Sequence, residues 1–464
     1  MSRVDLAIIG AGPAGLSAAL MARAAGVPVT VIDENPLPGG QIFRQMPRGF
    51  RALRPGALGH TYSKGQDLLE QVAGADVQVL SNTLVWGIFH PLTLALERED
   101  EAEALQCRAL VLATGAHDRP IPFPGWTLPG VMTLGAAQTL VKSQRILPGR
   151  RMVLAGSGPF LLPVAAQLLR GGARVAAILE ASRPRTWFRK AGSLWGQWGR
   201  FREAVEYLRP ILSSRVPVRF GQTIVAARGG ETIEEVTIAS LDQGWRPIPG
   251  SEYTLRVDAA CVGFGFTINT QLSRLCGCEH VFRPRAGGYV VGHDGWQRTS
   301  VPDIFVAGEA TGVAGVDSAM AEGAIAGIGA ALALGAISEA EALRLAAPHR
   351  ERLGRLKPFV EMIGDLFSPR EGLMELITDE TTLCRCEEVT AGEVRRAVQE
   401  GAKDVNGVKS RVRAGMGHCQ GRICGPIVAQ MLARQTGRPV EEVGAFTARP
   451  ILKPVSLGAI AGMD

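Results

Sequence analysis

Four cysteines near the carboxyl end of the chain have the spacing of a metal centre. Cys384 and Cys386 are separated by one residue, Cys419 and Cys424 by four, and 32 residues lie between the two pairs. Four thiolates in two close pairs are what a [2Fe-2S] cluster requires, because each iron takes two of them along with the bridging sulfides. Zinc also accepts four cysteines, but its pairs usually leave two or more residues between ligands, so C-x-C is tight for zinc. The spacing favours iron and sulfide, with zinc and an empty fold as alternatives.

The segments around these cysteines predict a small helical domain. Thr390 with Glu393 three residues later is a capping box, and an amphipathic helix is expected to follow it. A glycine-rich stretch, AGMGHCQGR, comes next, and a second helix is expected to begin near Gly425-Pro426. Main-chain N–H groups of that stretch can donate to cluster sulfurs, which raises the reduction potential.

The other four cysteines are interpreted as structural. Cys276 and Cys278 also form a C-x-C, but no second pair lies nearby in sequence, and NTQLSRLCGCEH is typical of the end of a packed helix. Cys107 and Cys261 lie in apolar stretches and are expected to be buried as small hydrophobic residues.

The amino-terminal 33 residues have the pattern of a dinucleotide-binding fold. An apolar strand runs into GAGPAG at residues 10–15, then into an alanine-rich helix and a second strand that ends in an acid. The three glycines permit a tight turn, close approach of a pyrophosphate and close packing of helix on strand, and the helix start supplies N–H groups to the phosphates. This acid, Asp33, is placed to accept hydrogen bonds from the hydroxyl groups of a ribose. The residues expected at this site are Gly10, Gly12, Pro13, Ala14, Gly15, Asp33 and Glu34.

Three further segments indicate whether the first motif binds FAD or NAD. They are PGGQIFRQ (38–45), LVLATGA (110–116) and VPDIFVAGEATG (301–312). With the first motif they resemble the two-dinucleotide-binding-domain flavoproteins, in which the ATG turn marks the crossing between domains. The resemblance implies FAD, with an acid near the ribityl chain and a helix from about Ser318 that points at the flavin pyrimidine. That acid is usually Asp and is Glu309 here. The further residues implied are Gly40, Gln41, Val85, Ala113, Thr114, Gly115, Gly308 and Glu309.

A second nucleotide motif occurs at residues 151–182 in an altered form. Gly156 and Gly158 are present, but Leu161 occupies the third glycine position, where close helix packing favours no side chain. Pro163 is tolerated because it falls in the first helical turn. Glu180 would repel a 2′-phosphate, so NADP is disfavoured. NAD(H) or ATP/ADP could bind here, or the fold could be a relic that binds nothing.

Composition sets the broad class. The chain has 464 residues, 46% of them hydrophobic and 20% charged, with a net charge of +6, which suits a globular protein of two to four domains and does not indicate nucleic-acid binding. The amino terminus enters a strand at once, so we expect a cytoplasmic protein, with a peripheral inner-membrane position through its electron acceptor as a variant. The run 318–337 contains Glu322 and several glycines and is expected to be a core helix and not a transmembrane segment.

The whole arrangement resembles the alpha subunits of heteromeric opine oxidases, of proline and hydroxyproline dehydrogenases, and the FAD subunit of hydrogen cyanide synthase. The most specific stretches of this resemblance are GAHDRPIPFPGWTLPGVMTLGAAQTLVK and RAGMGHCQGRICGP. The cysteine region also resembles bacterioferritin-associated ferredoxin. The disulfide reductases of the wider family carry a Cys pair beside the flavin, and this chain has none there. The resemblance implies a beta subunit of the FAD-dependent amino-acid oxidase type, a small third subunit in some complexes, and FMN at a subunit interface in others.

The predicted fold class is α/β, with two Rossmann-like domains of the glutathione/thioredoxin reductase type and a small helical C-terminal [2Fe-2S] domain. The expected divisions are an FAD domain at 1–117 and 268–345, a second nucleotide domain at 118–267, a helical linker at 346–375, the [2Fe-2S] domain at 376–440 and an extended tail at 441–464.

Two segments are candidates for partner contacts. Arginines and tryptophans alternate at 183–208, which is typical either of a protein interface or of a surface helix with its aromatics turned inward. The proline-containing tail is expected to run extended across its own surface or a partner's.

Three functions follow. The first is the electron-accepting subunit of an amino-acid or opine dehydrogenase, with no catalytic base of its own and with His117 as a turn residue. The second is a free-standing NADH:acceptor oxidoreductase, and the third is a non-catalytic iron–sulfur or adenine-nucleotide sensor.

Overall fold

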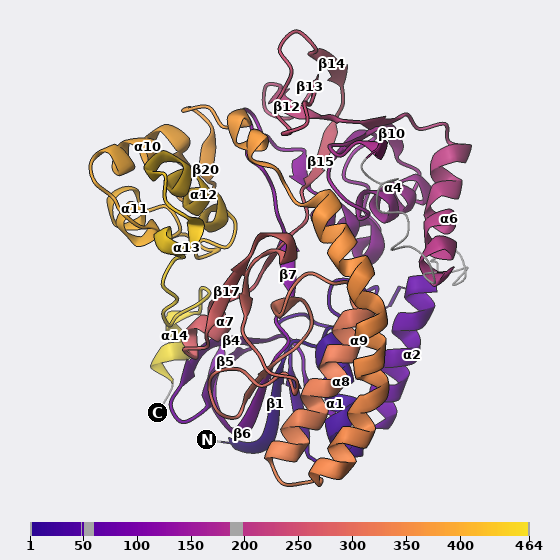
Figure 1. Cartoon of the computed structure of the whole chain (residues 1–464), viewed down its shortest axis with the longest axis vertical. Coiled ribbons are helices and arrows are strands. Elements are labelled where there is room, and N and C mark those ends of the chain that lie inside the picture. The colour runs from indigo at the N-terminus through magenta and orange to yellow at the C-terminus, as the bar shows by residue number, and fades with distance from the viewer. Residues whose placement is uncertain (1, 48, 51–59, 186–197, 463–464) are drawn as a thin grey trace. The chain divides into compact units, whose positions relative to one another are not determined.

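The computed structural model describes residues 2–47, 49–50, 60–185 and 198–462 (Figure 1). Contacts divide the chain into two units. The first consists of Met1–Ala116, Ile268–Val360 and Thr447–Asp464, and the second of His117–Thr267 and Glu361–Phe446. Each unit is therefore assembled from segments that lie far apart in the sequence.

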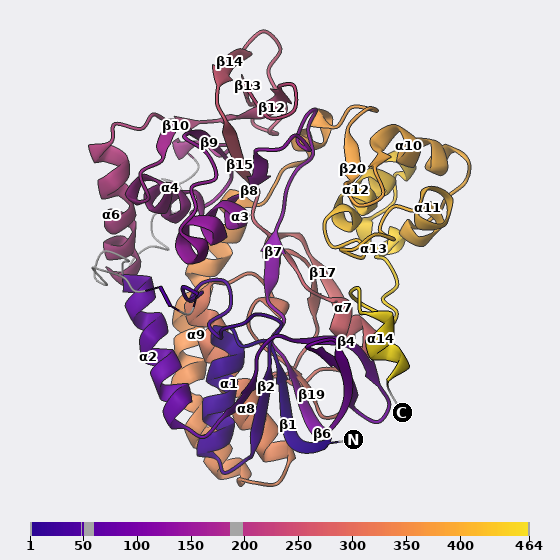
Figure 2. The ribbon, with the colours of Figure 1, turned by 180° about the vertical axis from the view of Figure 1, so that it is seen from behind.

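A seven-stranded sheet forms the centre of the first unit (Figure 2). Its order is β3-β2-β1-β6-β5-β4, with β19 also paired to β6. Strands β3, β2, β1, β6 and β19 pair in parallel, and β4 and β5 extend the sheet as antiparallel strands. The strands are β1 Ser2–Ile9, β2 Val29–Ile32, β3 Gln78–Leu80, β4 Thr83–Phe89, β5 Thr93–Arg98, β6 Glu101–Leu112 and β19 Ile304–Val306. The parallel part brings the carboxyl ends of β1, β2, β6 and β19 to one edge, which is where α/β sheets bind their ligands.

Two helices of small residues pack closely on each other in this unit. They are α1 (Pro13–Ala24) and α8 (Val316–Ala333), which run side by side in Figure 1. A Cβ at Gly323 would lie 2.0 Å from the Ala14 carbonyl oxygen, and one at Gly327 would lie 2.2 Å from that of Ala18. Helix α8 is long and apolar enough to cross a membrane, but most of it is buried in this contact, so it is the core helix that the sequence predicts. The unit also contains α2 His60–Gly74, α7 Gln271–Leu275, β17 His280–Arg283, η4 Pro284–Ala286, β18 Gly288–Val291 and η5 Gly308–Ala310.

The second unit is built on a five-stranded parallel sheet of order β11-β10-β9-β15-β8, with a three-stranded antiparallel sheet of order β12-β13-β14. Short strands β7 and β16 pair where the chain passes from one unit to the other. The bounds are β7 Ala116–Asp118, β8 Val131–Thr133, α3 Leu134–Thr139, η2 Leu140–Gln144, β9 Arg151–Gly156, α4 Leu161–Arg170, β10 Arg174–Glu180, α6 Trp198–Ser213, β11 Val218–Phe220, β12 Gln222–Arg228, β13 Glu235–Ser240, β14 Tyr253–Arg256, β15 Ala259–Gly263 and β16 Phe266–Ile268.

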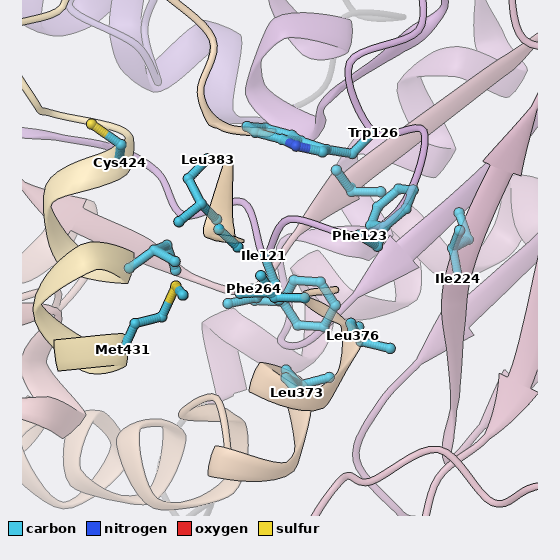
Figure 3. Close-up of a cluster of buried hydrophobic side chains, with 14 of the residues drawn as sticks. Ile121, Phe123, Trp126, Ile224, Phe264, Leu373, Leu376, Leu383, Cys424 and Met431 are labelled. Atoms are coloured by element: carbon cyan, nitrogen blue, oxygen red, sulfur yellow. The ribbon is translucent and has the colours of Figure 1, made fainter. Parts of the chain in front are cut away.

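The cysteine region shares a hydrophobic core with this second unit. After α9 (Glu339–Phe367), the chain forms η6 Glu371–Leu376, β20 Thr382–Cys384, β21 Val389–Thr390, α10 Ala391–Gln399, α11 Val405–Val412, α12 Cys424–Thr436 and α13 Val440–Val443. Leu383 and Met431 belong to the same buried cluster as Phe123 and Phe264 of the nucleotide-binding part (Figure 3). The indole N–H of Trp126 donates to the Thr382 carbonyl at 2.6 Å. The two parts of this unit therefore fold against each other.

The carboxyl-terminal tail lies on the first unit and is only partly extended. The N–H of Leu452 donates to the Trp86 carbonyl at 3.0 Å, and Lys453 forms an ion pair with Glu34. The prediction of an extended segment is wrong for α14 (Leu457–Ala461), which begins because the Ser456 hydroxyl accepts from the Ala459 N–H and caps it. The tail therefore contacts its own chain.

The predicted interface segment 183–208 is described only in part. Trp187 and Trp195 lie outside the described residues, and Trp198 begins helix α6.

Candidate functional site

The first glycine motif forms the turn that the sequence predicts. Gly10 has a φ of +108°, and a Cβ there would lie 2.3 Å from the Ala113 carbonyl oxygen. A Cβ at Gly15 would lie 1.8 Å from the Gly10 carbonyl oxygen, so α1 can approach β1 only because residue 15 has no side chain. Helix α1 begins at Pro13, and no side chain caps its first N–H groups. These N–H groups and the positive end of the helix dipole suit a diphosphate.

The loop at residues 38–41 folds over this turn. The Gly39 N–H donates to the Ala11 carbonyl at 2.7 Å, and a Cβ at Gly40, whose φ is +61°, would lie 2.7 Å from the Gly12 Cα. Gln41 lies beyond this contact, and its side-chain oxygen accepts from Arg44 at 2.9 Å. The loop therefore lies against the glycine turn.

The acid at the end of β2 already has backbone donors. One Asp33 carboxylate oxygen accepts from the Ala11 N–H at 2.6 Å, and the other accepts from the Asn35 N–H at 2.7 Å. The Thr83 N–H donates to the Asp33 carbonyl, so the start of β4, which carries the buried Val85, runs beside this corner. Asp33 thus ties the glycine turn to the end of β2.

Asn269 forms hydrogen bonds with the ATG turn at residues 113–115, and the sequence did not predict this role for Asn269. The Thr114 hydroxyl donates to the Asn269 carbonyl at 2.9 Å, the Asn269 side chain donates to the Thr114 carbonyl at 2.9 Å, and the Asn269 N–H donates to the Gly115 carbonyl at 3.1 Å. Gly115 has a φ of +65°, which favours glycine. The two passages of the chain between the units are therefore joined at this turn.

A second buried acid, Glu322 of α8, supports the Gly308-Glu309 turn. One Glu322 carboxylate oxygen accepts from the Gly308 N–H at 3.0 Å and from the Thr311 hydroxyl at 2.7 Å. Burial raises the pKa of Glu309 to about 7 and, with a smaller contribution from Glu309, also that of Glu322 to about 7. The sequence signal for Glu322 was a carboxylate in an apolar helix, because such a group must find donors in the core.

The second glycine motif repeats the carboxylate arrangement of the first. Glu180 accepts from the Gly158 N–H at 2.9 Å and the Ser182 N–H at 2.8 Å, much as Asp33 does in the first unit. Burial raises the pKa of Glu180 to about 7. A Cβ at Gly156 would lie 1.8 Å from the Gly263 carbonyl oxygen, so this glycine is sterically required.

Two features separate this second motif from a working phosphate site. Helix α4 begins at Leu161, whereas α1 begins at Pro13, the equivalent of Pro159, so the second helix starts two residues later and buries Leu161 in the core. Pro163 is in its first turn, as predicted. The Ser157 hydroxyl donates to the Phe367 carbonyl at 3.1 Å, and a Cβ at Gly158 would lie 3.6 Å from the Phe367 Cβ. Phe367 therefore lies where a pyrophosphate would approach Gly158.

The four late cysteines come together in the second unit. Cys384 contacts Cys424, and Cys386 contacts Cys419, so each contact joins one cysteine of the first pair to one of the second. Cys384 and Cys424 are buried, and Cys386 is exposed. A Cβ at Gly417 would lie 2.2 Å from the Cys386 Cβ, so the loop can close over Cys386 only with glycine there.

The surroundings favour a thiolate at Cys384. A hydrogen bond from the Cys424 thiol lowers the pKa of Cys384 to about 5, and N–H groups that include those of Gly415 and Glu387 add to the effect. The same hydrogen bond, with burial, raises the pKa of Cys424. Partial burial and the neighbouring Cys419 raise that of Cys386. Two neighbouring thiol pairs with backbone donors suit the ligands of a [2Fe-2S] cluster, which needs deprotonated sulfurs and sulfur-directed N–H groups.

Cys276 and Cys278 lie in a different environment. Both pack in or against the core of the first unit, where burial raises the pKa of Cys276 to about 12 and also raises that of Cys278. Cys107 and Cys261 are buried, as predicted. These thiols belong to the packing of their units.

His117 connects the unit crossing to the cysteine loop. Its Nε2 lies 2.9 Å from the carbonyl oxygen of Arg422, between Cys419 and Cys424. Sequence reasoning assigned it only the role of a turn residue, because nothing local indicates a partner 305 residues away.

Comparisons with known proteins match the two segments of the chain in which these sites lie. Residues 4–323 match the family "Pyridine nucleotide-disulphide oxidoreductase", and residues 382–434 match "BFD-like [2Fe-2S] binding domain". The chain belongs to the pyridine nucleotide-disulphide oxidoreductase family. Among its relatives, the hydrogen cyanide synthase subunit HcnB of Pseudomonas aeruginosa is 35% identical over 460 residues, which cover 98% of either chain. An opine oxidase subunit from Agrobacterium tumefaciens is 35% identical over 476 residues, covering 98% of this chain and 91% of the relative.

The fold of this oxidoreductase is also found in a solved structure. L-proline dehydrogenase from P. horikoshii superposes with a TM-score of 0.71 at 21% identity, over 99% of this chain and 80% of the other. The family match confirms the predicted α/β fold, the FAD-binding fold and the [2Fe-2S]-binding domain, and it makes the chain a flavin-dependent oxidoreductase. The individual residues expected to contact FAD stay predictions, as do the domain boundaries.

The two groups supply complementary chemistry when bound. FAD takes two electrons together and gives them up singly, whereas a [2Fe-2S] cluster takes one. The residues described above provide a glycine turn with uncapped helix N–H groups for the first group and two neighbouring pairs of thiols for the second.

Proposed function

We propose that the chain is the electron-accepting subunit of a heteromeric dehydrogenase that oxidises a C–N bond of an amino acid or opine. A substrate-oxidising beta subunit of the FAD-dependent amino-acid oxidase type donates electrons to the FAD of this chain. They leave through a [2Fe-2S] cluster on Cys384, Cys386, Cys419 and Cys424 to an external acceptor. The names of the relatives, which are subunits of hydrogen cyanide synthase and opine oxidase, support a complex with partner subunits.

The observation that carries this proposal is that one chain combines the glycine turn of the first unit with the paired cysteines of the second. Only Ala116 separates Gly115, the last residue of the ATG turn, from His117, which contacts the Arg422 carbonyl in the cysteine loop. A relay from a two-electron to a one-electron group needs both kinds of site in one protein, and this chain forms both.

The free-standing NADH oxidoreductase is the less favoured alternative. Such an enzyme would use the second nucleotide motif, and there Phe367 accepts from Ser157 and lies beside Gly158. We infer that the second fold serves as a support for the cysteine region, with which it shares a core. FMN at a subunit interface and a small third subunit belong to the same proposal and depend on the partner.

The test is reconstitution with and without the partner. The chain is purified alone and together with the products of neighbouring reading frames, and each sample is analysed for flavin and iron. Anaerobic dye reduction is then measured with proline, hydroxyproline, glycine and opines. We expect no reduction by the isolated chain, reduction by the complex, and no bleaching of the isolated flavin by NADH.

Two matched variants make this test specific for the relay. In the complex, Cys384→Ser should leave substrate-driven flavin bleaching intact and stop transfer to a one-electron dye, whereas Cys276→Ser should behave as wild type. An isolated chain that oxidises an amine unaided, or a Cys384→Ser complex with full dye reduction, would refute the proposal.

A further inference from the structure

Phe446 lies in a slot made by three glycines of the cysteine region. A Cβ at Gly415 would lie 2.5 Å from the Phe446 Cε2 atom, one at Gly421 would lie 2.3 Å from Cδ2, and one at Gly425 would lie 3.2 Å from Cδ2. The Lys409 ammonium lies over the ring, 5.5 Å from its centre. The ring therefore contacts backbone where each of these residues lacks a side chain.

The glycines of this slot are the same ones that surround the cysteines. The Gly415 N–H donates to the Cys384 sulfur, Gly421 lies between Cys419 and Cys424, and Gly425 directly follows Cys424. Packing behind these backbone groups fixes where their N–H groups and the adjacent sulfurs point. A residue in this place acts on the metal site through the ligands and not by touching it.

Phe446 is supplied from outside the part of the chain that matches the [2Fe-2S]-binding domain. That match ends at residue 434, whereas Phe446 follows α13 and a turn at Gly444, which has a φ of +77°. We propose that Phe446 is a positioning residue for the iron–sulfur cluster: its ring fills the glycine slot, fixes the cysteine loop and keeps water from the inner side of the site. This inference rests on the proposed cluster ligands and is independent of the partner and the substrate.

Backbone conformation alone does not explain the slot. Gly415 and Gly421 have φ values of +87° and +78°, where glycine is favoured whatever lies nearby. Gly425 is different, because it lies in α12 with no positive φ. Alanine is ordinarily the more stable residue in a helix. At Gly425 the ring of Phe446 lies 3.2 Å from the missing Cβ, and the following Pro426 also restricts a residue that carries a Cβ in helical backbone.

The first experiment measures how firmly the full-length holoprotein holds its cluster. In Phe446→Ala, we expect loss of iron to an iron(II) chelator after dithionite reduction to be about 10-fold faster or more, as for other residues that support metal ligands. The electron paramagnetic resonance signal of the reduced cluster should shift or broaden, and Phe446→Leu should lie between wild type and alanine. Phe220→Ala is the matched control, because Phe220 is an exposed phenylalanine of β11 in the same unit.

Flavin content separates this effect from misfolding. FAD binds in the other unit, so a folded Phe446→Ala protein should keep wild-type flavin content while it loses iron faster. Wild-type rates of iron release with an unchanged resonance signal would overturn the inference. Faster iron release with normal flavin in Phe220→Ala would also overturn it, because any lost phenylalanine would then have the same effect.

A double-mutant cycle tests the contact itself and remains informative if Phe446→Ala holds little iron. Gly425→Ala should lower the melting temperature of the wild-type chain, since its Cβ presses on the ring, and should lower it less in the Phe446→Ala background, where the restriction by Pro426 remains but the ring is gone. This difference between the two backgrounds is the expected result. The same sign and size in both backgrounds would show that the ring does not occupy the slot, and would refute the inference.

Discussion

The sharpest prediction for the flavin site concerns Gly15→Ala. A Cβ at this position would lie 1.8 Å from the Gly10 carbonyl oxygen, whereas ordinary contacts begin at 3.4 Å, so α1 must move away from the turn by about 1.6 Å. Overpacking of this kind costs roughly 1–3 kcal/mol. If the folded chain relieves the clash by moving α1, the N–H groups at its start leave the diphosphate, and the dissociation constant of FAD should rise roughly 5- to 150-fold.

The assay is titration of the deflavinated protein with FAD, followed by flavin fluorescence. Gly74→Ala is the matched control, since Gly74 is an exposed helical glycine with no atom within 4 Å of its missing Cβ. Visible absorbance of the iron–sulfur centre reports that the second unit is folded. Wild-type affinity and melting temperature in Gly15→Ala would refute the steric reasoning, because a real helix cannot accept a 1.8 Å contact without moving.

Three further predictions concern the second unit. Thr390→Ala removes the cap in which Thr390 accepts from the Glu393 N–H, and should lower stability by about 1 kcal/mol in denaturant unfolding, with Thr390→Ser close to wild type. The buried Glu180 has a pKa of about 7 against an ordinary 4.5, so its contribution is complete below pH 4.5 and is lost as the pH rises through 7. Glu180→Gln should remove about 3 kcal/mol of the change in unfolding free energy between low and high pH. Thermal unfolding of both proteins at several pH values measures this, and the same pH dependence in the variant as in wild type would contradict it. Cys424→Ser should give a preparation without iron–sulfur absorbance, whereas Cys261→Ser should keep the absorbance of the wild type. Equal absorbance in the two variants would contradict the ligand assignment.

Much of the fold could be predicted because its signals are local. The turn at Gly10, the capping box at Thr390 and the core helix at α8 each depend on residues within a few positions of one another, and all are present. The family match confirms the flavin and iron–sulfur folds that these signals indicated. Local chemistry was sufficient there.

The contacts that sequence reasoning missed join residues far apart in the chain. Asn269 holds a turn 155 residues earlier, and His117 contacts a carbonyl 305 residues later. Glu322 could be recognised as unusual but not given a partner, since its donors belong to a different element. For Phe446 the sequence shows only glycines, whose purpose depends on a ring beyond the matched domain. Periodicity and spacing carry no information about such pairs.

The division of the chain also bears on how the protein is made. The sheet of the flavin-binding unit contains strands from β1 near the start of the chain to β19. The part of this unit that is synthesised last is the tail, which forms a hydrogen bond with Trp86 and an ion pair with Glu34. The strands and helix α8 of this unit are synthesised before the cysteine region, but the tail contacts can form only after that region has been synthesised. A truncation before residue 447 removes the tail contacts and should yield protein that loses flavin faster than the full chain.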